Sequence, residues 1–479
     1  MTRLIVGPFN RVEGDLEVKL DIEAGTVTRA HVVSPLFRGF ERMLLGKPPL
    51  DALVYAPRIC GICSVSQSVA AARALASAMD LTMPPNGEIA INLVHATENV
   101  ADHLTHFYLF FMPDFARPAY SGESWYPAAA ERFRAIEGTA SQDALPARAQ
   151  FMHIMGLLAG KWPHTLSVQP GGSTRTVTGG EIARLAAILA AFRKFLERTL
   201  FGDRLERIGA LSSAQELGEW AAEKPETSSD FRHFLHLSNA LDLARLGPSV
   251  ERYMSYGAYG SLFKRGLFVK GNQVPLDTTV IAEDLSHAWY AREDGPRKPE
   301  EGRTDPDADQ SEGYSWCKAP RLDGQVVEVG ALARQVVDGH PLIRDIVVSS
   351  GGSVHSRVVA RLLEIALVVM AMENWVGALN PDEPFIMHGE LPREGHGQGM
   401  TEAARGSLGH WLEIEKGRIA NYQIIAPTTW NFSPRDAQGT PGPLEQALIN
   451  APVLAGEKEP VSVQHIVRSF DPCMVCTVH

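Results

Sequence analysis

The sequence predicts an α+β fold that is mainly helical: a central bundle of long helices with small β-sheets at its periphery. Apolar residues recur at helical spacing in several long segments, and alternating apolar and polar residues near the N-terminus indicate short strands. Helices of this length usually pack as a bundle. An apolar fraction of 45% in 479 residues suits a sizeable core, and no segment has the character of a linker between folding units. We therefore expect a single domain over residues 1–479.

Each expected element follows from a local pattern. Residues 3–35 are predicted to form short strands, because residues 16–20 and 26–33 alternate apolar and polar side chains. Helical spacing predicts long helices in four segments: residues 66–79, 88–112, 181–205 and 357–376. Residues 260–350 are expected to mix short strands and turns. Within them, residues 292–313 carry eight acidic and four basic side chains and no large apolar one, which predicts a solvated loop.

Charge and hydropathy argue against several classes of protein. A net charge of −11 disfavours non-specific binding to nucleic acid, which needs a basic face. The most apolar segment, residues 362–379, is interrupted by Glu364, Glu373 and Asn374, so we expect a buried helix and no direct membrane span. No signal peptide is apparent. Five cysteines do not make a disulfide framework, so a reducing compartment, the cytoplasm, is expected.

Two Cys-x-x-Cys pairs lie near opposite ends of the chain, Cys60 with Cys63 and Cys473 with Cys476. Four thiolates in two such pairs are suited to a soft transition metal. Structural zinc sites usually keep their pairs within about 20 residues of each other, whereas these are about 400 residues apart. The whole fold must therefore close before the site exists, which favours a catalytic centre over a structural one. A thioredoxin-like redox pair and a non-catalytic metal site are the alternatives.

The motifs around these pairs resemble the large subunit of nickel–iron hydrogenases. The first pair has the form Arg-x-Cys-Gly-x-Cys, and the second lies in Asp-Pro-Cys-x-x-Cys-x-x-His at the end of the chain. Further matching segments occur in the family's order, so that the resemblance covers the whole chain: residues 11–15, 38–41, 106–108, 403–406 and 426–431. The resemblance implies that family's large-subunit fold.

In this family the four cysteines hold a nickel–iron centre that cleaves H2 heterolytically. The resemblance implies that Cys63 and Cys476 bridge nickel and iron, whereas Cys60 and Cys473 bind nickel alone. It also implies that the iron carries one carbon monoxide and two cyanide ligands. Soft thiolates fit such a centre chemically.

Other site residues are likewise implied by the resemblance. Glu13 matches the proton-transfer glutamate, for which the chemistry requires a carboxyl group near a nickel-bound sulfur. Glu41, the backbone carbonyl of Ile424 and the terminal His479 match the ligands of a second, hard cation, usually Mg²⁺.

A charged group is implied above the open metal position. Arg405 matches a catalytic guanidinium there, with Asp102 and Asp471 balancing its charge. Pro427 and Thr428 match residues that line the diatomic ligands of the iron, where a hydroxyl donates to cyanide nitrogen.

Four features of the sequence resemble the regulatory, hydrogen-sensing branch of the family. Gln67 stands where catalytic members commonly have histidine, and an amide donates a hydrogen bond but carries no proton at neutral pH. Ile62 and Phe110 are bulkier than the usual valine and leucine at a narrow part of the gas channel. No extension follows His479, whereas many members are made with one that is removed. We therefore expect an oxygen-tolerant, low-turnover H2 sensor that signals to a histidine kinase; the alternative is a respiratory uptake hydrogenase.

Electron transfer requires a second chain. Four cysteines are assigned to the metal centre and only Cys317 remains, which is too few to ligate an iron–sulfur cluster. The resemblance names the partner: an iron–sulfur small subunit in a heterodimer, or in a dimer of heterodimers. Cys317 itself is expected to be a packed or interfacial thiol.

Overall fold

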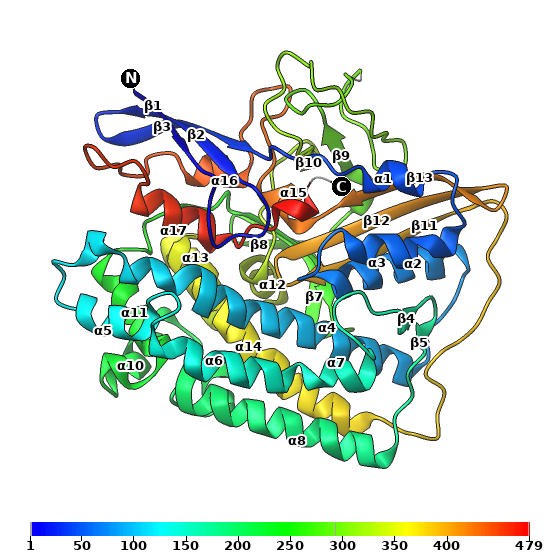
Figure 1. The fold of residues 1–479 in the computed structure, drawn as a ribbon, viewed down its shortest axis with the longest axis horizontal. Coiled ribbons are helices and arrows are strands. Elements are labelled where there is room, and N and C mark those ends of the chain that lie inside the picture. The colour runs from blue at the N-terminus through cyan, green and yellow to red at the C-terminus, as the bar shows by residue number, and fades with distance from the viewer. Residues whose placement is uncertain (1, 293, 478) are drawn as a thin grey trace.

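Most of the long predicted helices lie in the lower half of the molecule in Figure 1, and the larger sheets lie above them. The computed structural model describes residues 2–292, 294–477 and 479. Helix α14 (Val354–Ala378) runs diagonally through the helical layer and packs against α4 (Pro85–Thr105), α8 (Gly179–Phe195) and α12 (Ala331–Asp338). The apolar residues 362–379 thus belong to a helix packed within the protein. None of the helices in the described part of the chain is long and apolar enough to cross a membrane.

The predicted long helices are confirmed, with some changes at their ends. Residues 66–79 lie in α3 (Ser64–Ala78), and α4 continues into a π-helical turn at His106–Phe111. Helix α8 begins with a capping box between Thr178 and Glu181 and likewise ends in a π-helical turn, Leu196–Leu200. The remaining helices are α1 (Phe40–Leu44), α2 (Ala52–Tyr55), α5 (Tyr126–Phe133), α6 (Thr139–Phe151), α7 (His153–Leu158), α9 (Leu205–Gly209), α10 (Ala214–Ala222), α11 (Asp230–Ala240), α13 (Pro341–Ser350), α15 (Pro427–Asn431), α16 (Pro443–Ala447) and α17 (Val461–Ser469).

Small antiparallel sheets lie around the helices, as predicted. The N-terminal sheet has the order β1 (Thr2–Val6), β2 (Glu17–Glu23) and β3 (Thr26–Val33). The other sheets are β6 (Arg252–Ala258), β7 (Phe263–Val269) and β8 (Asn272–Val274); β11 (Gly395–Ala403), β12 (Gly406–Glu415) and β13 (Arg418–Ile425); β4 (Val168–Gln169) with β5 (Gly172–Ser173); and β9 (Ile281–Asp284) with β10 (Ala319–Leu322).

The sheet β11–β13 positions the first cysteine pair, because β11 packs directly on α3. Gly397 and Gly399 make this approach possible: a Cβ atom on Gly399 would collide with the carbonyl oxygen of Ala70, and one on Gly397 with that of Ala74. Helix α3 begins immediately after Cys63, so this packing fixes the helix that carries one half of the site. The largest group of buried apolar side chains in the described part of the chain runs from Val6 to Cys476.

Two expectations for residues 260–350 are corrected. Residues 331–350 form α12 and α13 and are not strands and turns. The loop at 292–313 is not simply solvated, because Thr304 is buried and its hydroxyl donates to the carboxylate of Glu41. Glu293 of that loop lies outside the described residues. Thr304 and Glu41 are far apart in the sequence, and no local sequence pattern indicates a contact between them.

Candidate metal centre

The four cysteines of the two distant pairs come together in the folded chain. The Sγ atoms of Cys60 and Cys473 are 3.4 Å apart, and Cys476 Sγ lies 3.1 Å from both Cys63 Sγ and Cys473 Sγ. All four sulfurs lie within 4.8 Å of one another and all four residues are buried. Their separations far exceed the ~2.05 Å of a disulfide bond.

The donor set fits a thiolate-bound metal. Four sulfurs at about 2.3 Å from a tetrahedral ion would lie about 3.8 Å from each other, which is close to the spacing found here. Hydrogen bonds from Cys473, Cys476 and Cys63 lower the pKa of the Cys60 thiol well below its ordinary value, whereas contact with Cys473 raises the pKa of Cys63. Four buried sulfurs held this close together suit a shared cation, because a bound metal ion offsets the repulsion between thiolates.

A buried carboxylate supports the first pair. Cys63 is the N-cap residue of α3, and its side chain does not cap the helix. Glu98 on α4 takes this role, because its carboxylate accepts from the backbone N–H groups of Val65 at 2.8 Å and Ser66 at 2.9 Å. Burial raises the pKa of Glu98 to about 7, although these N–H groups lower it. The indole Nε1–H of Trp162 also donates to Glu98, at 2.9 Å.

Backbone pairing and a left-handed turn support the second pair. After α17, Asp471 takes a φ of 56°, and Glu13 then pairs with Cys473 in a parallel bridge. The Glu13 N–H donates to Pro472 O at 3.3 Å, and the Met474 N–H donates to Glu13 O at 2.7 Å. Gly14 has a φ of 79°, and a Cβ there would lie 3.0 Å from Val475. The Glu13-Gly14 motif therefore lets the tail dock closely.

The half-buried Glu13 lies in the electrostatic field of the cluster. Burial raises the pKa of its carboxyl group, and negative charge at Cys60 raises it further, whereas Arg405 and Arg38 lower it. A carboxyl group so placed can hold a proton close to the sulfur ligands.

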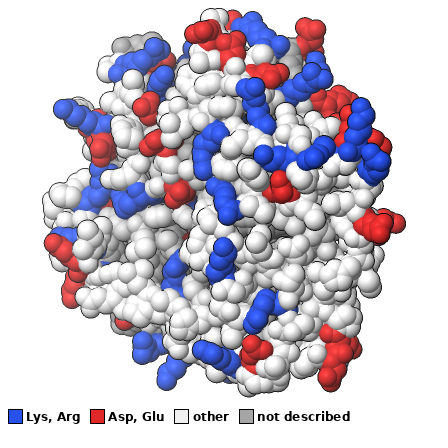
Figure 2. Space-filling model, turned by 45° about the vertical axis from the view of Figure 1, so that its right-hand side comes forward, with Lys and Arg blue, Asp and Glu red and all other residues white. Residues whose placement is uncertain are grey.

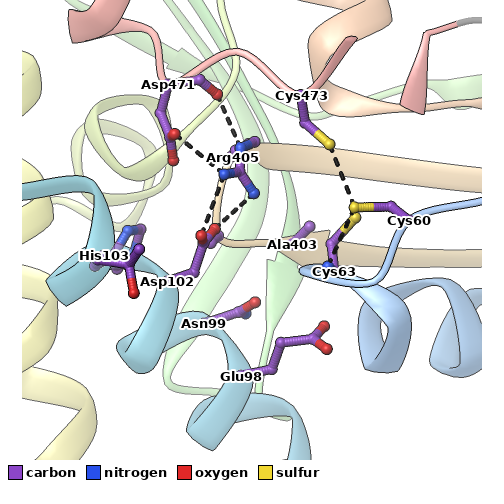
Figure 3. A network of polar contacts seen from close by, with 12 residues as sticks. Cys60, Cys63, Glu98, Asn99, Asp102, His103, Ala403, Arg405, Asp471 and Cys473 are labelled. Carbon is purple, nitrogen blue, oxygen red and sulfur yellow. Dashed lines mark hydrogen bonds and ion pairs between the residues drawn. The ribbon is translucent and has the colours of Figure 1, made fainter. Parts of the chain in front are cut away.

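Arg405 is clamped between two carboxylates beside the cysteines, as Figure 3 shows. Its Nη1 and Nη2 donate to Asp102 at 2.6 and 3.1 Å, and Nη2 also donates to Asp471 Oδ1 at 3.1 Å. All three side chains are buried. Although burial lowers it, the two carboxylates raise the pKa of Arg405, so the guanidinium stays charged. The structure thus brings together the charged group that the sequence analysis expected.

Thr428 and Gln67 take part in hydrogen bonds that the sequence did not indicate. The hydroxyl of Thr428, which follows Pro427 in the first turn of α15, accepts from the Cys473 N–H at 3.1 Å. Its own hydrogen remains available for donation. Gln67 Oε1 lies 2.8 Å from His410 Nε2, and His410 Nδ1 lies 2.8 Å from the Tyr422 hydroxyl. The buried Gln67 Nε2 lacks a hydrogen-bond partner among the described residues.

The three residues expected to bind a hard cation also converge. His479 Nε2 contacts the carbonyl oxygen of Ile424 and lies 3.6 Å from Glu41 Oε1. Burial lowers the pKa of His479, and the ammonium of Lys318 helps to lower the pKa of Glu41 against the effect of burial. One imidazole, one carboxylate and one carbonyl fit part of a Mg²⁺ shell. Lys318 Nζ, 3.1 Å from Glu41 Oε2, adds a positive charge that the sequence analysis did not place there.

The residues expected to narrow a gas channel are not joined by any described contact. Ile62 is half-buried and packs against the core, whereas Phe110 is half-buried in the π-helical turn after α4. Cys317 is buried, its thiol donates to the Lys318 carbonyl oxygen at 3.3 Å, and it lies outside the four-cysteine group, as expected for a packed thiol.

Several supporting residues escaped the sequence analysis. Glu98, Trp162 and His410 lie in segments whose local pattern is that of an ordinary helix, loop or strand. Arg38 falls within a matching motif but received no role; its guanidinium donates to the carbonyl oxygens of Ile59 and Val475, one beside each cysteine pair. Only Glu98 could have been noticed from the sequence, because it is an acidic residue within a long helix that was predicted to pack in a bundle.

Comparison with known proteins decides the family. The family profile described as nickel-dependent hydrogenase matches residues 38–119 and 118–479. The chain belongs to the nickel-dependent hydrogenase family. It is 28% identical to the periplasmic NiFeSe hydrogenase large subunit of Desulfomicrobium baculatum, covering 100% of this chain and 95% of that protein. It is 26% identical to the hydrogenase-2 large chain of Escherichia coli K12, with coverage of 100% and 97%.

Solved hydrogenase structures have the same fold. The structure of H2-activated NiFeSe hydrogenase from Dm. baculatum superposes with a TM-score of 0.86 at 28% identity, over 100% of both chains. The NiFeSe hydrogenase of D. vulgaris Hildenborough in its reduced state gives 0.85 at 28% identity, again over 100% of both. The chain is therefore a hydrogenase large subunit with the family's large-subunit fold, and its four cysteines are positioned for metal binding.

Proposed function

We propose that this large subunit, paired with an iron–sulfur small subunit, cleaves H2 heterolytically at a nickel–iron centre held by Cys60, Cys63, Cys473 and Cys476. The observation that carries the proposal is the closure of two cysteine pairs, about 400 residues apart, into one buried cluster beside Glu13 and Arg405. When bound, the metal pair with its carbon monoxide and two cyanide ligands supplies the redox chemistry that takes up the electrons of H2.

Proton transfer, the positioning of H2 and hydrogen bonding to cyanide are assigned to different side chains. The Glu13 carboxylate receives a proton and passes it outward, since it is half-buried and its backbone is bonded to the Cys473 segment. The Arg405 guanidinium, held by Asp102 and Asp471, polarises and positions H2. Thr428 can donate its hydroxyl hydrogen to a cyanide nitrogen while its oxygen accepts from Cys473.

Replacement of Glu13 tests the proton route. Glu13→Gln should abolish hydrogen–deuterium exchange while nickel and iron contents and the infrared bands of carbon monoxide and cyanide stay as in the parent. Glu13→Asp, which keeps a carboxyl group, should retain part of the exchange. Full exchange in the glutamine variant would exclude Glu13 as the proton acceptor. Absence of the infrared bands in the parent protein would overturn the proposed centre itself.

A Mg²⁺ ion bound by Glu41, Ile424 O and His479 is the second part of the proposal. It is supported by the contact of His479 Nε2 with both other groups. Lys318 is the alternative cation for Glu41. Its ammonium also contacts Gln423 Oε1 at 2.7 Å and lies 3.6 Å from the carboxylate of Glu283. We expect about one magnesium per chain by elemental analysis, lost in Glu41→Gln. A magnesium-free parent with intact infrared bands would show that Lys318 serves as the cation here.

The docking face for the small subunit is proposed near the first cysteine pair. Large apolar side chains are exposed on and around α1 and α2: Leu36, Met43, Leu45, Leu50 and Val54. Figure 2 brings forward the side of the molecule on which α1 and α2 lie; Lys and Arg are spread over the middle of that face, with wide uncharged areas between them. Such a surface suits a permanent partner. Val54→Glu with Leu50→Glu should prevent co-purification of the small subunit, whereas Ile136→Glu, at a distant exposed site, should not.

A sensing role is the finer proposal. It is supported by Gln67, whose amide has replaced a titratable imidazole, and by the bulk of Ile62 and Phe110. The sensor would be oxygen-tolerant, turn over slowly, reside in the cytoplasm and signal to a histidine kinase. The alternative, a respiratory uptake enzyme, is favoured by the names of relatives such as the uptake hydrogenase large subunit of Afipia carboxidovorans, 27% identical over the whole chain.

Oxygen exposure separates these roles. We expect the parent to keep its H2 oxidation after prolonged exposure to air, and Ile62→Val combined with Phe110→Leu to lose it. Equal sensitivity of both proteins would contradict a narrowed channel. Binding of a histidine kinase in a pull-down from the cytoplasmic fraction would support signalling, and fast turnover with a respiratory acceptor would favour the uptake role.

A further inference from the structure

Glu98 is a buried carboxylate surrounded by hydrogen-bond donors from two segments, residues 64–66 and Trp162. Oε2 accepts from the Val65 N–H, from Trp162 Nε1 and, at 3.3 Å, from the Ser64 hydroxyl. Oε1 accepts from the Ser66 N–H and, at 3.2 Å, from the Ser66 hydroxyl. The side chain is 2% exposed. In Figure 3 it extends from α4 below Cys63, whereas Asp102, on the same helix, points toward Arg405.

These contacts suit the ionised form of Glu98. Its two oxygens face five donor groups, and three of these are N–H groups, which cannot accept a hydrogen bond from a protonated carboxyl; only the two serine hydroxyls could accept one. The first turn of α3 adds the partial positive charge of a helix N-terminus. Among the described residues no Lys or Arg forms an ion pair with Glu98, since Arg405 is engaged with Asp102 and Asp471. Its negative charge is therefore balanced only by dipoles.

The position of this charge relates it to the cysteines. Ser64 and Val65 are the two residues after Cys63, so bonds to them fix the end of α3 that carries the ligand. The segment that contains Trp162 and His164 is bonded to the same region. The His164 N–H donates to Ser64 Oγ at 3.3 Å, and His164 Nδ1 lies 3.0 Å from Pro57 O. Negative charge at Cys60 contributes to the raised pKa of Glu98, so the two groups interact electrostatically.

We infer that Glu98 is a positioning residue that fixes the Cys63 ligand and, when it is ionised, raises the electron density of the metal centre. The inference rests on the proposed nickel–iron centre. Groups outside the ligand shell tune a metal through the field and the hydrogen bonds that they present to its ligands. The Arg405 guanidinium, beside the cluster, withdraws electron density, whereas the ionised Glu98 carboxylate, below Cys63 in Figure 3, supplies it.

Infrared spectra of the purified heterodimer at pH 9 test the sign of this effect. Glu98→Gln removes the charge with little change in shape, so the carbon monoxide and cyanide bands should move to higher frequency. Trp162→Phe removes one donor but keeps the charge, which becomes less neutralised, so the bands should move to lower frequency. Glu98→Asp retains the charge, so the frequencies of its bands should be closer to those of the parent than the frequencies of the glutamine variant are.

Opposite shifts are the decisive signature, because a general loosening of the site would move both variants the same way. Unshifted bands in both variants, with only a lower thermal midpoint, would reduce Glu98 to a structural cap and overturn the inference. If Glu98→Gln does not retain metal, Trp162→Phe alone decides by the direction of its shift. Absence of all bands in the parent would instead overturn the proposed centre.

Discussion

The Cys60–Cys63 loop and the Cys473–Cys476 loop each supply two cysteine sulfurs, but the chain supports them in different ways. The first pair leads into a fifteen-residue helix, α3, whose start is bonded to the anionic side chain of Glu98. The second pair follows a left-handed Asp471 and is held by backbone pairing with Glu13 and by the cationic Arg405, which donates from Nε to the Asp471 carbonyl oxygen at 2.9 Å.

This difference shows how one buried site can be assembled from two parts of unequal rigidity. A helix capped by a buried side chain holds its first residues in place through regular hydrogen bonds. A C-terminal tail has no such support and would fray unless other segments tie it down. Arg405, Glu13 and Thr428 provide those ties from three distant positions. Perturbation of the second pair should therefore have the larger effect on stability and metal retention.

Loss of Arg405 should have the largest effect. Arg405→Ala leaves the buried carboxylates of Asp102 and Asp471 without their partner, which costs about 3–5 kcal/mol in buried ion pairs. Chemical denaturation should show this loss together with a low nickel content. Arg405→Lys keeps the charge but not the bidentate geometry and should lose less. Equal stability of the alanine variant and the parent would contradict the role of Arg405 in holding the tail.

Loss of the Thr428 hydroxyl should be less severe. Thr428→Val is nearly isosteric and leaves the buried N–H of Cys473 without an acceptor, which costs about 1–3 kcal/mol. The neighbouring Thr429 offers a matched control, because its buried hydroxyl has no partner among the described residues. Thr429→Val should therefore be neutral or slightly stabilising in the same denaturation experiment. Similar losses in both variants would show that side-chain packing, and not the hydrogen bond, supports Cys473.

The same contrast explains what the sequence could predict. The cysteine pairs, Glu13, Arg405 and His479 lie in motifs, so their convergence was expected, and the long helices followed from their apolar spacing. Glu98 and His410 were missed, because a contact between two elements leaves no periodic signal in either. Thr304 was missed for the same reason, and its loop was wrongly expected to be only solvated.

The smallest effect is expected at Tyr422, two hydrogen bonds away from Gln67. Burial lowers the pKa of His410 to about 3, so its imidazole is neutral and carries one ring hydrogen. Because the amide oxygen of Gln67 can only accept, that hydrogen lies on Nε2, and Nδ1 in turn accepts from the Tyr422 hydroxyl. The amide Nε2 of Gln67 is then left facing away from His410 as a donor.

Tyr422→Phe removes this hydrogen bond to Nδ1 and should cost about 1 kcal/mol in the free energy of unfolding. A double-mutant cycle with Gln67→Leu tests whether the chain acts as a unit. Tyr422 and Gln67 are joined only through His410, so the two losses should deviate from additivity by more than about 0.5 kcal/mol. Strict additivity would mean that Gln67 sets its own orientation, and that the first cysteine pair owes its fixed surroundings to Glu98 without help from this chain.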